Sequence, residues 1–190
     1  MKRVVVFGTT GSGKSWLANR LSERTGLRVI ELDALYWGPN WQGATDHLFR
    51  HRVERETVPL AGDDSGWIVV GNYGQVRDLT WHLADTLIWF DLPSRVVFWR
   101  LLRRTVGRVI SGEELWRTGN RETFRNSFLS RQSILLWALK THRRNRKRFA
   151  IECSILGKDK KVVQLRSPRE VEAFLGSHPP PPRDGGGAMN

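Results

Sequence analysis

Eight consecutive residues near the amino end have the types and the spacing that phosphate binding requires. Gly8–Ser15 fits the pattern G-x-x-x-x-G-K-[ST] at every fixed position. Glycines let backbone N–H groups approach a polyphosphate, the lysine reaches its β- and γ-phosphates, and the final hydroxyl joins a magnesium shell. The pattern therefore predicts ATP binding with Mg²⁺, which Ser15 would help to hold. The residues expected to bind the nucleotide here are Gly8, Thr9, Thr10, Gly11, Ser12, Gly13, Lys14, Ser15 and Trp16.

The segments around this loop alternate between two patterns. Short apolar runs, typical of buried strands, occur at 2–7, 27–32, 67–70, 86–90 and 161–165. Helical patterns occur at 14–25, 45–60 and 95–106, in a long stretch ending near 148, and at 168–176, where Ser167, Pro168 and Glu170 form a capping box. Strands that alternate with helices predict an α/β fold, with a parallel sheet covered on both faces.

The chain is expected to form one domain over residues 1–176. Residues 107–120 have no clear period and predict a mobile excursion, whereas the proline- and glycine-rich tail, 177–190, is expected to be disordered. The longest apolar runs are too short to span a membrane, and the amino end does not resemble a signal peptide. The single cysteine, Cys153, excludes an internal disulfide and is expected to pack as a small apolar residue. These observations predict a cytoplasmic protein without a membrane partner.

Positive charge is concentrated in one part of the chain. The net charge is +12, and residues 95–148 contain fifteen Lys and Arg against three Glu. Such a field attracts nucleotide phosphates or nucleic acid, although it can also be a merely solvated surface.

A combination of further motifs resembles one family. These motifs are the segments 4–8, 31–37, 66–73, 84–93, 114–116, 119–122 and 165–170. Over about Lys2–Leu175 the chain resembles the adenylate-kinase-related P-loop kinases known as DNA topology modulation proteins. The resemblance implies a P-loop NTPase fold like that of nucleoside monophosphate kinases: three α/β/α layers, a five-stranded parallel sheet and a lid at about 104–126.

The resemblance also implies catalytic roles. Asp33 matches the acidic D-x-D position of small-molecule kinases, where it would orient or deprotonate an acceptor hydroxyl or hold magnesium through water; a cap of a helix or turn is the alternative. Arg100 and Arg104 share a helix face and would clamp the transferring phosphoryl group, together with Lys14. The turn at Arg166 is where related kinases hold the adenine.

Several other side chains are candidates for contacts with the acceptor or the transferred group. Arg103 adjoins the arginine pair, and two arginines of the lid are expected to close over the phosphates. Aromatic residues after Asp33 could stack on an acceptor, although packing in the core is the alternative. The residues concerned are Arg117 and Arg121 in the lid, Tyr36, Trp37 and Trp41 after Asp33, and Asn72, Tyr73 and Arg77 after the third strand.

One position departs from the family pattern. Related kinases have an aspartate immediately before Gly71, where this chain has Val70. The substitution removes a carboxylate expected to support magnesium. Asp91 also ends an apolar strand, but the Leu-Pro that follows it matches a position beside the lid rather than beside the metal.

Two functions follow as hypotheses. The first is a phosphotransferase that moves the γ-phosphate of ATP to a small acceptor, with a nucleoside monophosphate as one candidate. The second is a regulatory protein that binds nucleic acid through residues 95–148 and has weak or no kinase activity. The sequence does not identify the acceptor.

Overall fold

The computed structural model describes residues 1–58, 66–116, 118–123 and 134–180. Its centre is a five-stranded sheet of order β2-β3-β1-β4-β7 in which every neighbouring pair is parallel. The strands are β1 (Arg3–Gly8), β2 (Arg28–Glu31), β3 (Trp67–Val70), β4 (Thr86–Phe90) and β7 (Lys161–Leu165). The expected parallel sheet is confirmed, and three of its strands have the predicted bounds.

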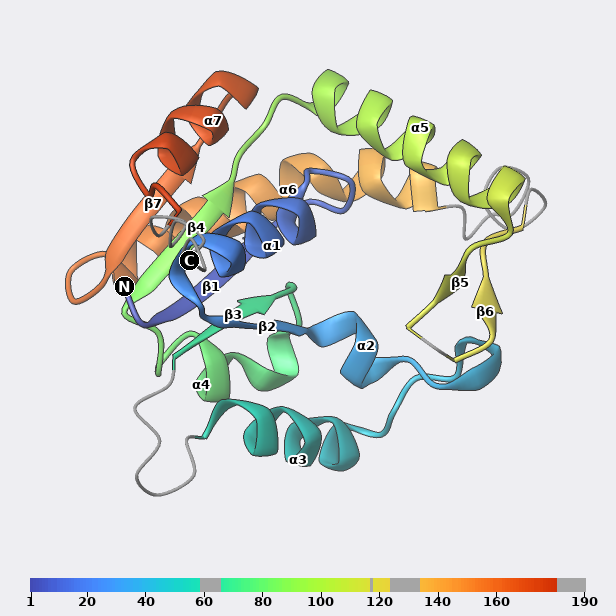
Figure 1. Cartoon of the computed structure of the whole chain (residues 1–190), viewed down its shortest axis with the longest axis horizontal. Helices are drawn as coiled ribbons and strands as arrows, with labels where there is room; N and C mark the ends of the chain where they lie inside the picture. The colour runs from blue at the N-terminus through green and yellow to red at the C-terminus, as the bar shows by residue number, and fades with distance from the viewer. Residues whose placement is uncertain (59–65, 117, 124–133, 181–190) are drawn as a thin grey trace, which may run out of the picture.

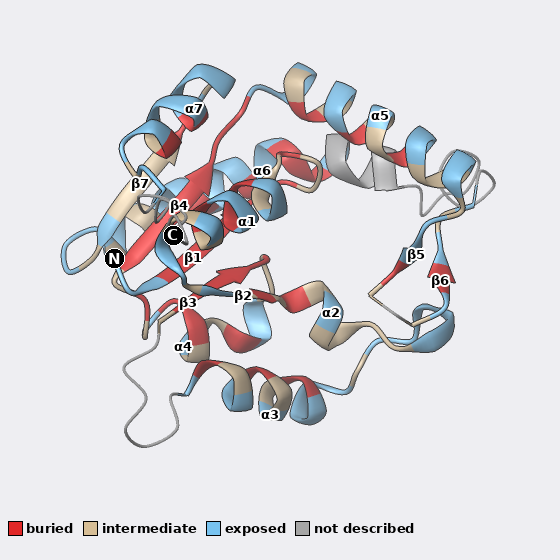
Figure 2. Ribbon diagram, viewed as in Figure 1, coloured by how far each residue is buried: buried red, intermediate tan, exposed pale blue. Residues whose placement is uncertain are grey.

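Helices cover both faces of the sheet (Figure 1). Alternate strand residues face opposite layers: Val4 and Val6 pack with α1 (Lys14–Thr25) and α7 (Pro168–Gly176), while Val5 and Phe7 pack toward α3 (Asp46–Thr57) and α6 (Ile134–Leu156). The short α4 (Arg77–Thr80) lies beside α3. Figure 2 shows the buried residues concentrated along the central strands, as expected for a parallel sheet enclosed on both sides.

Helix α5 (Ser94–Ser111) differs from the prediction. It continues five residues beyond the expected end at Val106 and passes through Gly107. Its buried residues Val97, Leu101 and Thr105 recur every four positions, so a continuous inner stripe stabilises the helix. The expected excursion over 107–120 is therefore largely regular: it contains the end of α5 and the antiparallel pair β5 (Glu114–Leu115) and β6 (Asn120–Arg121).

A buried asparagine attaches this hairpin to the segment after β2. The side-chain amide of Asn120 donates to the carbonyl oxygen of Gly38 at 2.8 Å, and its oxygen accepts from the backbone N–H of Trp41 at 2.9 Å. Gly38 precedes the 3-10 helix η1 (Pro39–Trp41), of which Trp41 is the last residue, and η1 follows the short helix α2 (Leu32–Tyr36). The far end of α5 is thus connected to the segment that follows Asp33.

The capping box at the start of α7 is confirmed. Ser167 caps the helix by accepting from the backbone N–H of Glu170 at 3.2 Å, and Glu170 accepts from the backbone N–H of Arg166 at 2.9 Å. At the start of the expected tail, the carbonyl oxygen of His178 accepts a hydrogen bond of 3.0 Å from Arg24. The rest of the tail, 181–190, lies outside the described residues.

In the described part of the chain, no helix is both long and apolar enough to cross a membrane. Cys153 packs partly buried against the aromatic core, as expected, and burial raises the pKa of its thiol to about 11.

Candidate functional site

The phosphate-binding motif forms a tight loop between β1 and α1. Gly8 and Gly11 have φ angles of +140° and +77°, in the region that favours glycine. A Cβ at Gly8 would lie 2.6 Å from the carbonyl oxygen of Phe90, and one at Gly11 would lie 2.6 Å from Cβ of Leu101. The glycines therefore let the loop fit between β4 and α5.

Three neighbouring segments hold this loop in place. Asn72 donates to the carbonyl oxygen of Gly8 at 2.6 Å and accepts from its N–H at 3.0 Å. The guanidinium of Arg100 donates to the carbonyl oxygen of Ser12 at 2.9 Å, and the hydroxyl of Thr9 lies 3.2 Å from Nδ1 of His142 on α6. Gly8, Thr9 and Ser12 serve the loop's own structure and do not line the cavity described next.

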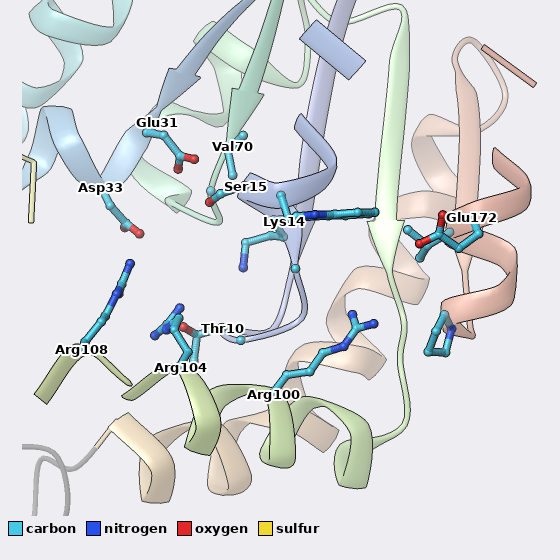
Figure 3. Close-up of a pocket in the computed structure, with 16 residues that line it drawn as sticks. Thr10, Lys14, Ser15, Glu31, Asp33, Val70, Arg100, Arg104, Arg108 and Glu172 are labelled. Carbon is cyan, nitrogen blue, oxygen red and sulfur yellow. The ribbon is translucent and has the colours of Figure 1, made fainter. Parts of the chain in front are cut away.

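A cavity of about 460 Å³ lies over the loop, at the carboxyl ends of the strands (Figure 3). Such a volume is typical of sites for small molecules. The sequence-predicted residues that line it are Thr10, Gly11, Gly13, Lys14, Ser15, Trp16, Asp33, Arg100 and Arg104. Further lining comes from Glu31, Val70, Gly71 and Arg108, and from Pro168, Val171 and Glu172 at the start of α7.

Lys14 lies in the middle of this cavity. Its ammonium donates to the carbonyl oxygens of Gly8 at 3.0 Å and Thr9 at 3.1 Å. Burial lowers the pKa of Lys14 to about 8, with Arg104 acting in the same direction, while Asp33 and Glu31 oppose the shift. An incoming anion would stabilise the charged form of Lys14, so a lysine at this position favours the binding of phosphate.

Two carboxylates form one end of the cavity. Asp33 accepts a hydrogen bond of 2.7 Å from the hydroxyl of Tyr73. Burial, with Asp33 next in effect, raises the pKa of Tyr73, so this phenol keeps its proton and remains a donor. Glu31 is hydrogen-bonded to the Ser15 hydroxyl, and burial raises the pKa of Glu31. Asp33 is the second residue of α2, because β2 ends at Glu31, one residue before the end of the predicted apolar run 27–32.

Three arginines of α5 line the opposite wall. Arg100, Arg104 and Arg108 recur every four residues on one helix face. Burial and the adjacent Arg108 lower the pKa of Arg104. Arg108 pairs with Glu122 at 3.1 Å and Glu113 at 3.4 Å, and Figure 3 shows it pointing toward Asp33. Arg108 was not predicted, although its spacing of four from Arg104 is visible in the sequence.

Several sequence-predicted residues lie outside the cavity. The Arg166 side chain donates to Gln164 at 2.8 Å and does not line the cavity, although Pro168 of the same turn does. Arg77 pairs with Glu152 and lies over the ring of Trp81, so it faces the core between α4 and α6. The other candidates that do not line the cavity are Arg103, Arg121, Tyr36, Trp37, Trp41, Asn72 and Tyr73, while Arg117 lies outside the described residues.

Asp91 is also directed away from the cavity. Its buried carboxylate pairs with Nε of Arg146 at 2.7 Å and accepts from Gln164 at 2.8 Å. The strand-ending aspartate therefore connects β4 with α6 and β7.

No protein-family model matches this chain, and no curated protein matches it, so the family expected from the motifs is not shown.

Solved structures do share the architecture. A sugar kinase from Janibacter sp. HTCC2649, solved without ligand, aligns with a TM-score of 0.52 and 19% identity over 93% of each chain. A gluconokinase from Sinorhizobium meliloti 1021 aligns with a TM-score of 0.48 and 20% identity, over 92% of this chain and 91% of the other. The sheet order and the first of these matches show that the chain has the P-loop fold of the nucleoside-monophosphate-kinase type.

Proposed function

We propose that the chain is a kinase that transfers the γ-phosphate of ATP to a hydroxyl or phosphate oxygen of a small acceptor. The observation that carries this proposal is the shared cavity of Lys14, Asp33 and Arg104. A loop for the donor phosphates, a carboxylate for the acceptor and a guanidinium between them are the parts that phosphoryl transfer needs. The fold shared with a sugar kinase is consistent with this chemistry.

Each residue has a defined part in the proposed transfer to a hydroxyl. Asp33 accepts the proton of the acceptor hydroxyl while the oxygen of that hydroxyl bonds to the γ-phosphorus. At the same time the bond between the γ-phosphorus and the oxygen that bridges it to the β-phosphate breaks, which leaves ADP. Lys14 and Arg104 neutralise the charge that spreads over the transferred group. Tyr73 holds the Asp33 carboxylate in position through its hydrogen bond.

The side chains present suit a magnesium ion held mainly by the nucleotide. No cluster of three or more His, Cys, Asp or Glu in the described residues could hold a metal alone. The Ser15 hydroxyl, however, lies against Glu31 in the same cavity, and oxygen donors are what Mg²⁺ prefers. We therefore assign Ser15 to the metal and Glu31 to its water shell, where the ion would offset charge on the β- and γ-phosphates.

The test is an ADP-release assay over sugars, sugar acids and nucleoside monophosphates. At least one acceptor is expected to raise the rate above the acceptor-free rate, and Asp33→Asn is expected to abolish that increase while ATP still binds. Lys14→Ala is expected to abolish ATP binding. If no acceptor raises the rate of the unaltered chain, the proposal fails.

One observation favours a second candidate function, nucleic-acid binding. The described part of α6 has exposed cations on its outer side, and none of them has an ion pair or hydrogen bond from its side chain to another described residue: Lys140, Arg143, Arg144 and Lys147. Free cations on one helix suit a phosphate backbone.

Salt-dependent binding of an oligonucleotide tests this candidate. The affinity is expected to fall steeply with salt, and replacing all four residues by alanine should flatten that dependence. Lys14→Ala is the matched control, since it should leave oligonucleotide binding unchanged. Absence of binding at low ionic strength would remove this candidate.

A further inference from the structure

The outer face of α5 carries an exposed apolar stripe that the proposed transfer chemistry does not use. Trp99 is 66% exposed, Val106 40% and Ile110 80%, and the ring of Trp99 packs edge-on against Phe98 of the same helix. Figure 2 shows the buried residues of α5 on the side toward α6 and the exposed ones on the outer side. Single exposed apolar residues are common, but three large ones on one helix face are typical of an interaction surface.

The spacing of the stripe indicates what kind of partner fits it. Its positions have the intervals of four, three and four residues at which two long helices pack side by side: Trp99, Arg103, Val106 and Ile110. These intervals read the same from either end of the helix. Two antiparallel copies of α5 would therefore place Trp99 of one against Ile110 of the other. In the middle, the aliphatic stem of Arg103 would cover Val106 of the second copy.

Charge favours the antiparallel arrangement over the parallel one. Arg95 lies one turn before the stripe and is exposed, without an ion pair to another described residue, while the exposed Glu113 and Glu114 follow the end of α5. A parallel pair would bring together the two copies of Arg95, whereas an antiparallel pair brings Arg95 close to the glutamates of the second copy. The first turn of α5 has no acidic residue of its own, so these glutamates would also lie near the positive end of the helix dipole.

We propose that the chain forms a symmetric dimer in which α5 packs antiparallel against α5 of a second copy. The cavity stays open in this dimer, because the arginines that line it project from the other side of the helix: Arg100, Arg104 and Arg108. A single pair of helices forms a small interface, below the ~1,600 Å² that is typical of stable complexes. The dimer is therefore expected to dissociate reversibly in the micromolar range.

Sedimentation equilibrium of the full chain tests the inference, at a salt concentration that screens the net charge of +12. The unaltered chain is expected to pass from monomer to dimer as its concentration rises through the micromolar range. Ile110→Glu should weaken the dimer about tenfold or more, because it places a carboxylate against the indole of Trp99. Ile151→Glu is the matched control, since Ile151 is 61% exposed on α6 and should leave the dimer unchanged.

A charge exchange tests the antiparallel register. Arg95→Glu should weaken the dimer, because it brings like charges together. Adding Glu113→Arg should restore it, while Arg108 keeps its ion pair with Glu122. A dimer that the paired exchange does not restore overturns the antiparallel arrangement. A chain that stays monomeric, or a dimer that Ile110→Glu leaves unchanged, overturns the inference and assigns the stripe to a partner of another kind.

Discussion

Glu31 lies directly opposite Val70 in the parallel register of β2 and β3. The kinases that the sequence motifs resemble have a carboxylate at the position of Val70, and this chain has one on the adjacent strand, next to the Ser15 hydroxyl. We therefore expect Glu31→Gln to raise the Mg²⁺ concentration needed for half-maximal ATP binding about tenfold, as loss of a supporting carboxylate does at other metal sites. A magnesium titration at fixed ATP measures this change.

The double variant Glu31→Gln with Val70→Asp provides the control. Because the two positions are paired across the sheet, an aspartate at 70 should restore part of the magnesium affinity. An unaltered magnesium dependence in Glu31→Gln would show that Glu31 does not support the metal.

The hydrogen bond from Tyr73 to Asp33 gives a second prediction. Tyr73→Phe keeps the ring in its aromatic cluster with Tyr36 and Phe49 but removes the hydroxyl that orients the carboxylate. We expect kcat to fall about tenfold with KM for ATP unchanged. Steady-state kinetics with the acceptor found in the panel measure the effect, and Tyr36→Phe serves as the control. A fall of equal size in both variants would argue against a positioning role.

The low pKa of Lys14 predicts how ATP affinity depends on pH. Burial lowers this pKa to about 8, so above pH 8 the free protein loses the Lys14 charge, while bound phosphates favour the charged form. ATP binding should then take up a proton, and Kd should rise up to tenfold per pH unit between pH 8 and the pKa of the complex. Calorimetry at several pH values checks this.

Lys14→Arg tests the assignment, since a guanidinium stays protonated and the pH dependence should disappear even if the affinity is lower. A Kd for the unaltered chain that is constant from pH 7 to 9.5 would contradict the prediction.

Asp91 is predicted to contribute to stability and not to nucleotide binding. Asp91→Ala removes a buried carboxylate that pairs with Arg146 and accepts from Gln164, so we expect the free energy of unfolding to fall by about 2 kcal/mol. Urea unfolding measures this loss, and ATP affinity at saturating Mg²⁺ should be unchanged. If the variant needed a higher Mg²⁺ concentration for half-maximal ATP binding than the unaltered chain, Asp91 would instead be assigned to the metal.

The sequence predicted the features that depend on neighbouring residues. The loop motif, the strand at Thr86–Phe90 and the cap of α7 at Ser167 are each specified within a few positions, and the structure has all three. The roles of Arg77 and Asp91 could not be predicted, because their partners lie 75 and 55 residues away. Such pairs depend on how α6 packs against the sheet, which spacing along the chain does not reveal.

The position where α5 ends could not be predicted from the sequence either. Residues 107–120 have no clear period in the sequence, yet Gly107 lies exposed on the helix with nothing within 4 Å of a Cβ built there, so it does not interrupt the buried stripe. The cost of about 1 kcal/mol for a helical glycine is small beside the packing of that stripe. Packing thus lets the helix continue past Val106, and it ends at Gly112, which has the left-handed conformation typical of a helix C-terminus.

The spacing of Arg100, Arg104 and Arg108 has a consequence for how this chain can vary. Four residues of α-helix advance about 6 Å, so the Cα atoms of the three arginines lie at equal intervals along the helix axis. One inserted residue between Leu101 and Arg103 would turn the two later arginines by about 100° and carry them out of the cavity. The length of α5 before Arg108 should therefore be fixed in any functional descendant of this sequence.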